Sequence, residues 1–347
     1  MILIISKYPT AANEKDGMIQ RIAAIDNIID AQQKIYLDIS YKKNLITKKT
    51  RTSTNTSVYE TNIVFGLFIA SYFAITANKI YVHSILNAIK ILPLYFFSKK
   101  ILTDLHGIVP EELHMQGRIY SSKIFSIVEH IVFYRSLKLI TVTNAMKEYL
   151  VKKYNQRINI STVPIFDSIS NIQKINITSN KLTIIYTGGS QKWQNVDLMF
   201  SAIKQTSNKY NYILLSGDID TFNKKAYEHG LDNTITIASV GKDEIYSWYS
   251  KADLGFVLRD DIAVNNVACP TKLIEYLING VVPIVIHPNI GDFNSMGYCY
   301  ITLDEFLNSQ FSESEIAAKR MKNYEIVTEY QRSISNGISE LEIFINR

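Results

Sequence analysis

The chain has 347 residues, of which 47% are hydrophobic and 20% are charged. This composition excludes disordered and fibrous proteins, and the length is sufficient for two domains with separate cores. The two cysteines, Cys269 and Cys299, do not have the spacing of a zinc site, and their low number is typical of a reducing compartment. Residues 1–6 enter a strand without the features of a signal peptide, which favours a cytoplasmic protein.

The net charge of +5 is unevenly distributed. Residues 1–165 contain 21 Lys and Arg against 11 Asp and Glu, a net of +10, whereas residues 166–347 contain 16 against 21, a net of −5. A basic half favours an anionic partner, either nucleic acid or a membrane. No zinc-finger, RNP or helix-turn-helix signature is present, so we predict an anionic membrane surface and no nucleic acid.

In the first half, short apolar runs alternate with segments that have the period of a helix. The runs predict strands at Ile2–Ser6, Lys34–Ile39, Lys79–Ser84, Ile101–Leu105, Leu137–Val142 and 160–165. Helices are predicted at 18–29 and 144–154, with Asn144 as the N-cap of the second. The basic segment Tyr41–Ser57 is predicted to be a long exposed loop. The alternation is typical of an α/β domain.

Two apolar stretches interrupt this pattern. Ile63–Ala77 contains fifteen residues without a charge, fewer than the roughly 20 that a membrane-spanning helix needs. Pro93–Phe97 adds an aromatic cluster between Lys90 and Lys99. One interpretation is two buried helices that flank the sheet. The other is a partly exposed face in the membrane interface, surrounded by basic residues.

The second half repeats the α/β alternation after a polar linker at 166–181. A strand at Leu182–Tyr186 leads into Gly188 and Gly189, and glycine lets a backbone approach a phosphate closely because it lacks a Cβ. Lys192 is the basic residue nearest this turn. The patterns GxGxxG and GxxxxGK[ST] are both absent, which counts against a dehydrogenase and a P-loop enzyme.

A further strand, Leu254–Leu258, is followed by a polar loop, a helix at Pro270–Asn279 and a strand at Val281–Ile286. Pro270 fits the first position of the helix, and Gly280 fits the position after its end. The amides of the first turn, which includes Thr271 and Lys272, carry the positive end of the helix dipole.

Arg259 ends the preceding strand and adds a second cation near this helix. Glu275 lies on the same helix face as Thr271, one turn further along. A diphosphate at the tip and a ribose on this carboxylate would form a nucleotide site. The alternative is an ordinary amphipathic helix in which Glu275 is a solvated charge.

The segment PTKLIEYLINGVVPIV resembles the donor site of family 4 glycosyltransferases, which have the two-domain GT-B fold. The family's ribose-binding Glu corresponds to Glu275, and Val267 stands where the family often has a second Glu. The resemblance implies an α/β protein with two Rossmann-like domains facing across a cleft. The expected parts are an acceptor-binding domain (1–165), a linker (166–181), a nucleotide-sugar-binding domain (182–330) and a C-terminal helix that crosses back to the first domain (331–347).

The resemblance also implies a function: transfer of a hexosyl-type sugar from a nucleotide-diphosphate donor to an acceptor hydroxyl, with retention of configuration. The donor side comprises Gly188, Gly189, Lys192, Arg259, Pro270, Thr271, Lys272 and Glu275. On the acceptor side we expect Gly17, His106 and Glu111, with His106 at the end of a strand where open α/β sheets place ligand-binding residues. Gly17 as a turn glycine and His106 as a backbone cap remain alternatives, and His83 is interpreted as structural.

No tightly bound cofactor is expected. Because an Asp-x-Asp motif is absent from the donor site, the resemblance implies that cations of the chain replace a metal ion. The expected setting is bacterial surface polysaccharide assembly (capsule, O-antigen or lipopolysaccharide), on a lipid-linked acceptor at the inner membrane face. One alternative, motivated by Val267, is a catalytically silent partner subunit of a glycosylation complex. The other is a sugar-nucleotide epimerase on paired Rossmann-like domains.

Overall fold

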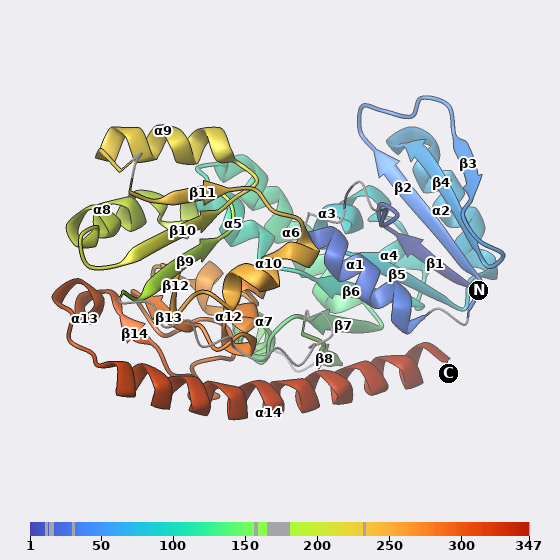
Figure 1. Ribbon diagram of the computed structural model, residues 1–347. Helices are drawn as coiled ribbons and strands as arrows, with labels where there is room; N and C mark the ends of the chain where they lie inside the picture. Colours follow the sequence, from blue (N-terminus) through green and yellow to red (C-terminus); the bar gives the residue numbers. More distant parts are fainter. Residues whose placement is uncertain are drawn as a thin grey trace. The chain divides into compact units, whose positions relative to one another are not determined.

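The computed structural model describes residues 1–10, 13, 17–29, 32–155, 159–164, 181–231 and 234–346 (Figure 1). The chain forms two compact units. The first contains Met1–Phe166, Val267–Cys269 and Ile334–Arg347, and the second contains Asp167–Asn266 and Pro270–Ser333. Of the predicted linker at 166–181, all residues except Lys181 lie outside the described residues.

Within the described residues, the sheet of the first unit has eight strands in the order β3-β4-β2-β1-β5-β6-β7-β8. All neighbours are parallel except β3 and β4. The side chains of β1, β6 and β7 are buried throughout, as expected for parallel strands covered on both faces. The strands are β1 (Ile2–Ile5), β2 (Lys34–Ser40), β3 (Lys48–Arg51), β4 (Thr56–Asn62), β5 (Lys79–His83), β6 (Ile101–Leu105), β7 (Lys138–Thr141) and β8 (Ile160–Thr162).

The prediction of one long loop at Tyr41–Ser57 is wrong. β3 and the start of β4 lie in this segment, and they pair antiparallel at the edge of the sheet. All four residues of β3, the sequence KKTR, are exposed. Such a strand has no apolar alternation for a sequence pattern to detect, and its charges discourage pairing with another chain.

The helices of the first unit connect its strands. They are α1 (Gly17–Ile28), α2 (Ile63–Thr76), α3 (Ile85–Ala88), the 3₁₀ turn η1 (Ile89–Ile91), α4 (Leu94–Phe97), α5 (Val109–Met115), α6 (Ile119–Arg135) and α7 (Asn144–Tyr154). The N-cap of α7 is Thr143, whose hydroxyl accepts a hydrogen bond from the amide of Met146, and not Asn144 as predicted. Asn144 is instead the first residue of the helix.

The α2 helix is not the buried helix of the first interpretation. Its exposed apolar side chains, here called the α2 stripe, are Val64, Phe65, Phe68, Tyr72 and Ile75. Their spacing places them along one side of the helix, and only Gly66 and Ala70 are buried. In α4, Leu94 and Tyr95 are buried, as the first interpretation predicted, whereas Phe97 is 85% exposed. Within the described residues, no helix combines the length and the apolar content that crossing a membrane requires.

The second unit has a parallel sheet, which among the described residues has the order β11-β10-β9-β12-β13-β14. The strands are β9 (Thr183–Thr187), β10 (Asn211–Leu215), β11 (Thr236–Ala238), β12 (Leu254–Val257), β13 (Val282–Val285) and β14 (Ile301–Thr302). The helices are η2 (Lys192–Gln194), α8 (Val196–Thr206), α9 (Ile219–His229), α10 (Lys242–Tyr249), α11 (Ala263–Asn266), α12 (Thr271–Ile278), α13 (Leu303–Asn308) and α14 (Glu313–Asn346).

In chain order this sheet reads 3-2-1-4-5-6, the order of a Rossmann-like domain. The order reverses between β9 and β12, and the carboxyl ends of these two strands are where such sheets bind ligands. The first unit has its corresponding reversal between β1 and β5. The chain is therefore an α/β protein with two Rossmann-like domains, as predicted.

The α12 helix packs unusually close to β12. A Cβ added to Gly255 of β12 would lie 2.4 Å from the Tyr276 ring, so glycine is what admits this ring. The Tyr276 hydroxyl in turn accepts a hydrogen bond from the amide of Thr187 at 3.0 Å. Gly280 follows the helix with φ of +68°, as expected for a C-terminal glycine. Pro270 is the N-cap and not the first helical residue, a shift of one position from the prediction.

The α14 helix is continuous over 34 residues. Its last part belongs to the first unit, where Leu341 and Ile345 pack in the core with strands β1, β5 and β6. Glu340 accepts a hydrogen bond from Nζ of the buried Lys138 at 2.7 Å. The C-terminal helix therefore returns to the first unit.

Candidate functional site

The carboxyl end of β9 leads into a glycine turn. Gly188 has φ of +142°, a conformation that residues with a Cβ rarely adopt. A Cβ on Gly188 would lie 3.2 Å from the hydroxyl of Tyr186 and 3.7 Å from Nζ of Lys272. The Tyr186 hydroxyl donates to the carbonyl oxygen of Gly189 at 2.6 Å. The turn is thus fixed next to the amino group of Lys272.

Lys272 is buried in the first turn of α12. Its Nζ donates to Oε1 of Gln194 at 2.6 Å and lies 4.3 Å from the centre of the Tyr186 ring. Burial, and then the neighbouring charge of Arg259, hold the pKa of Lys272 well below its ordinary value. The interior therefore opposes positive charge at this amine, which loses its proton more readily than an exposed lysine does.

Arg259 follows β12 and is also buried, with 8% of its surface exposed. Burial lowers its pKa to about 10. Its Nη1 donates to Oδ1 of Asn265 at 3.3 Å, and its Nε has no partner among the described residues. Neither Arg259 nor Lys272 forms an ion pair with any part of the chain that the structure describes.

Two neighbouring buried cations without an ion pair are costly, because charge is stable in a protein interior only when it is compensated. The two residues lie where the order of the sheet reverses, next to a glycine turn and the N-terminus of α12. An anion bound at this point would compensate both charges. It would also accept hydrogen bonds from the N–H groups at the N-terminus of the helix, which have no partner within the helix. The chemistry of this donor set fits a phosphate or diphosphate group.

Glu275 lies one turn further along α12 and is partly exposed. Its Oε2 accepts a hydrogen bond from the hydroxyl of Tyr249 at 2.5 Å. Burial, and then Glu275, raise the pKa of Tyr249 well above its ordinary value, so the hydroxyl keeps its proton and orients the carboxylate. The carboxylate is therefore held in place and is not a freely solvated charge.

The remaining predicted donor residues occupy different environments. Pro270 is buried and Thr271 is partly exposed at the start of α12. Lys192 lies in η2 with its side chain exposed, while Gln194 of the same turn is the residue that contacts Lys272. Sequence reasoning missed Gln194, Tyr186 and Tyr249. No local pattern marks them, because each acquires its place through the packing of separate elements.

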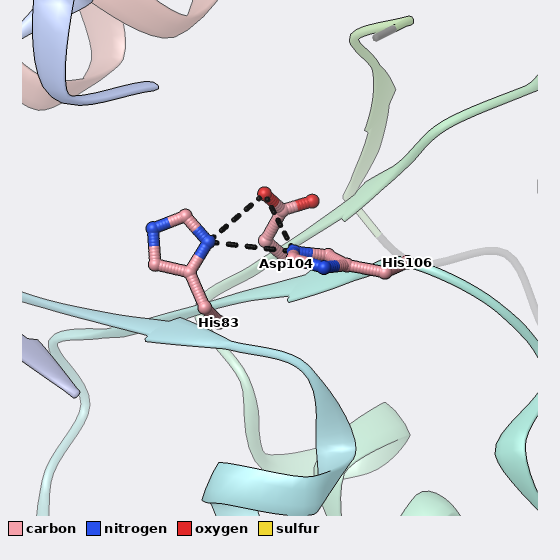
Figure 2. Close-up of side chains that lie close together, drawn as sticks. All are labelled: His83, Asp104 and His106. Carbon is pink, nitrogen blue, oxygen red and sulfur yellow. Dashed lines mark hydrogen bonds and ion pairs between the residues drawn. The ribbon is translucent and has the colours of Figure 1, made fainter. Parts of the chain in front are cut away.

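In the first unit, His106 follows β6 and belongs to a buried cluster with His83 of β5 and Asp104 of β6 (Figure 2). Oδ2 of Asp104 lies 3.4 Å from Nε2 of His106 and 3.5 Å from Nδ1 of His83. The two ring nitrogens are 3.4 Å apart. Only His106 is measurably exposed, at 12%. These three residues supply ligand types that could hold a metal ion.

Arg21 of α1 completes this cluster. Its Nε donates to Oδ2 of Asp104 at 2.9 Å and its Nη2 to Oδ1 at 3.0 Å, a bidentate pair in which both side chains are buried. Burial by itself would raise the pKa of Asp104, but Arg21 and then His106 outweigh it and hold the pKa well below its ordinary range. Asp104 is therefore ionised at neutral pH. The Asp within the apolar strand ILTDL could have indicated this cluster, because a carboxylate is unusual in a buried strand.

Burial lowers the pKa of His83 from 6.5 to about 4. The unfolded chain therefore binds more protons than the folded chain between pH 4 and 6.5, and stability is expected to rise with pH across this window. His83 changes the free energy of unfolding by at most about 3 kcal/mol across this pH range. Urea unfolding at pH 4.5 and pH 7 measures it, with His83→Asn as the comparison. An identical pH dependence in the variant would contradict this assignment.

The other acceptor-side residues are not part of this cluster. Gly17 begins α1 and is exposed, and a Cβ added to it would meet no atom within 4 Å, so no close backbone approach requires glycine there. Glu111 accepts hydrogen bonds from the Tyr149 hydroxyl at 2.8 Å and from Nζ of Lys153 at 2.7 Å. In this structure its carboxylate ties α5 to α7.

A scan against protein-family models and a search of curated proteins both found no match. Solved structures do match. Sucrose-phosphate synthase from Thermosynechococcus elongatus has a TM-score of 0.74 at 13% identity, covering 100% of this chain and 99% of that one. Anabaena Alr3699/HepE, in complex with UDP and glucose, has a TM-score of 0.71 at 11% identity, covering 99% of each chain.

WaaG, a glycosyltransferase involved in lipopolysaccharide biosynthesis, has a TM-score of 0.66 at 12% identity and also covers 99% of each chain. These matches extend over both Rossmann-like units and the C-terminal helix. The chain therefore has the GT-B fold of these proteins.

Proposed function

We propose that this protein transfers a glycosyl group from a nucleotide-diphosphate sugar to a hydroxyl of an acceptor. One observation carries the proposal: Lys272 and Arg259 are buried side by side without an ion pair, next to the glycine turn at Gly188. The charge of Glu275 offsets the lowering of the Lys272 pKa only in part, because that pKa still lies well below its ordinary value. A diphosphate is the ligand that this arrangement accommodates.

The proposed reaction uses these charges when the glycosidic bond to the diphosphate breaks. Negative charge then accumulates on the leaving nucleoside diphosphate. Lys272, Arg259 and the N-terminus of α12 stabilise this charge in the transition state more strongly than they stabilise the bound substrate. Glu275 accepts hydrogen bonds from the two ribose hydroxyls. Because the cations already lie at the proposed diphosphate position, we propose that no divalent metal is needed. Retention of configuration remains part of the proposal.

The proposed donor carries a hexosyl-type sugar, and the proposed acceptor is a lipid-linked saccharide in surface polysaccharide assembly. Support comes from the similar proteins, since HepE was solved with UDP and glucose and WaaG is involved in lipopolysaccharide biosynthesis. Further support comes from an apolar and basic surface of the first unit.

The α2 stripe is adjacent to a basic loop. Asn62, the N-cap of α2, donates from its side chain to the carbonyl oxygens of Asn44 and Leu45 and so ties this loop to the helix. Leu45 and Ile46 are 78% and 87% exposed. They stand among exposed cations of the same segment, namely Lys42, Lys43, Lys48, Lys49 and Arg51. Exposed apolar side chains flanked by cations are the chemistry of an anionic membrane surface.

Phe68→Glu, which places a carboxylate in the centre of the α2 stripe, is expected to weaken binding to anionic phosphatidylglycerol vesicles by about tenfold or more. Sedimentation with vesicles measures this. Tyr227→Glu is the matched control, because Tyr227 is a 76% exposed aromatic residue of α9 in the second unit. Raising the salt concentration should release the wild type. Equal binding to neutral vesicles would remove the electrostatic part of the proposal.

A panel of nucleotide sugars tests the central proposal, first by thermal stabilisation and then by turnover with and without saccharide acceptors. Transfer or hydrolysis by the wild type, lost in Arg259→Ala, is the expected result. Conversion of the nucleotide sugar into an isomer, without an acceptor and without release of the free sugar, would indicate an epimerase. Binding without any turnover would favour the catalytically silent partner subunit, in which Val267 replaces a carboxylate.

A further inference from the structure

The helices that connect β4, β5, β6 and β7 lie on one face of the first sheet. In the strand order, these three connections all advance in the same direction, and crossover connections between parallel strands are right-handed. The helices α2, α3, α4 and α6 therefore form one layer, in which α2 contacts η1, and α6 contacts α3 and α4. The connection from β1 to β2 advances in the opposite direction, so α1 lies on the other face. There the end of α14 packs with it through Leu341 and Ile345.

The outer side of α6 resembles that of α2. Its exposed apolar side chains, here called the α6 stripe, are Tyr120, Ile124, Ile127 and Tyr134. Intervals of four, three and seven residues place them along one side of the helix. Phe96 and Phe97 of α4 are also exposed, and the Arg135 guanidinium at the end of α6 lies 5.3 Å from the centre of the Phe96 ring. The two helices thus present one apolar patch with a cation within it.

The exposed charges on this helical layer all have one sign. Residues 63–135 are described throughout, and each of their acidic side chains is buried or half-buried, namely Asp104, Glu111, Glu112 and Glu129. Their exposed charged side chains are all basic, namely Lys99, Arg118, Lys123 and Arg135. Exposed aromatic and aliphatic side chains among cations are complementary to an anionic lipid surface.

A second copy of the chain is a poorer occupant of this face. In a twofold dimer the same patch faces itself, so its four cations would approach their equivalents with no exposed carboxylate on either side. Like charges placed opposite each other in an interface oppose association. A nucleic acid would pair with the cations, but its phosphates would leave Phe97 and Ile127 uncovered. A bilayer accommodates both the cations and the apolar side chains.

We propose that α4 and the α6 stripe form, together with the α2 stripe, one docking face that lies on an anionic lipid bilayer. The α2 stripe is part of the proposed function, on which this inference rests for its lipid partner. The α4 and α6 residues extend that surface across the helical layer. Because α2 and α6 belong to one layer, both stripes engage the bilayer at once, and each strengthens the attachment made by the other.

Ile127→Glu, which places a carboxylate in the centre of the α6 stripe, is expected to weaken sedimentation with phosphatidylglycerol vesicles by about tenfold or more. The double variant with Phe68→Glu should bind more weakly than either single variant. Met321→Glu is the matched control, because Met321 is a 65% exposed apolar residue of α14 in the second unit. Thermal unfolding of each sample separates loss of binding from loss of the fold.

Fluorescence quenching by brominated phosphatidylglycerol measures the contact without disrupting the stripe. A tryptophan introduced by Tyr120→Trp should be quenched on vesicle binding. The wild type is the comparison, since its two tryptophans, Trp193 and Trp248, both lie in the second unit. Tyr120→Trp quenched no more than the wild type would overturn the proposal, whether or not Ile127→Glu folds.

Three further results would also overturn it. They are wild-type protein that does not sediment with these vesicles, a folded Ile127→Glu protein that binds them as the wild type does, and a wild-type dimer that Ile127→Glu converts to a monomer. Turnover with a water-soluble saccharide acceptor, measured without vesicles, separates this proposal from the proposed function. A wild type that binds vesicles through α6 but never transfers a sugar would refute the proposed reaction and leave the docking face established.

Discussion

Lys272→Met is expected to weaken nucleotide-sugar binding strongly while making the ligand-free protein more stable. The amino group lies beside Arg259 in a buried position that lowers its pKa, so its removal relieves repulsion and desolvation. We expect a gain of about 1 kcal/mol in the free energy of unfolding. We expect turnover to fall by about 100-fold or more, because one preorganised cation at the leaving group is lost.

The effect of Lys272 on stability depends on pH, and the sign of this dependence can be measured in the wild type. Because the folded pKa of Lys272 lies below its unfolded value of 10.5, the unfolded chain binds more protons between these two values. The stability contributed by this group therefore rises with pH toward 10.5. Lys272→Met should lose this slope, since it has no amine to titrate.

Lys251→Met is the matched control for Lys272→Met. Lys251 is exposed and lies over the ring of Trp248 in the same unit. This variant should leave both turnover and the melting temperature close to the wild-type values. A Lys272→Met protein that is less stable than the wild type and still binds nucleoside diphosphates would show that Lys272 is an ordinary structural residue.

Glu275→Ala is expected to weaken the binding of a nucleoside diphosphate by about 10- to 100-fold, because hydrogen bonds to a carboxylate are worth roughly 1.5–3 kcal/mol. Inorganic diphosphate should bind this variant as it binds the wild type, since it lacks the ribose. Lys272→Met should weaken both ligands. Calorimetry with the two ligands thus separates the ribose contact from the diphosphate contact.

The Tyr249→Phe variant tests how Glu275 is held. Loss of the hydroxyl removes the hydrogen bond to Oε2 of Glu275 but leaves the carboxylate, so we expect a smaller loss of affinity than in Glu275→Ala. A 2′,3′-dideoxy nucleoside diphosphate, which lacks both hydroxyls, should bind the wild type and Glu275→Ala with nearly equal affinity. A large difference for the dideoxy ligand would mean that Glu275 acts on another part of the substrate.

The elements that carry these residues could be predicted from short-range patterns. The apolar strands β6, β9 and β12 and the Gly280 stop signal each depend on neighbours within a few residues, which a sequence displays directly. The predicted strand at Ile101–Leu105 agrees with β6 at both ends. In contrast, the exposed strand β3 has no apolar alternation, and no pattern marks it.

The sequence by itself determined the two α/β units, the glycine turn after β9 and the cation at the start of α12, because these follow from periodicity, turn chemistry and helix ends. Tertiary structure alone decided that Lys272 meets Gln194, that Tyr249 orients Glu275, and that Arg21 reaches Asp104. The last pair is separated by 83 positions in the chain. Such contacts depend on which strands become neighbours in a parallel sheet, and crossover connections place those strands side by side without leaving a local signal in the sequence.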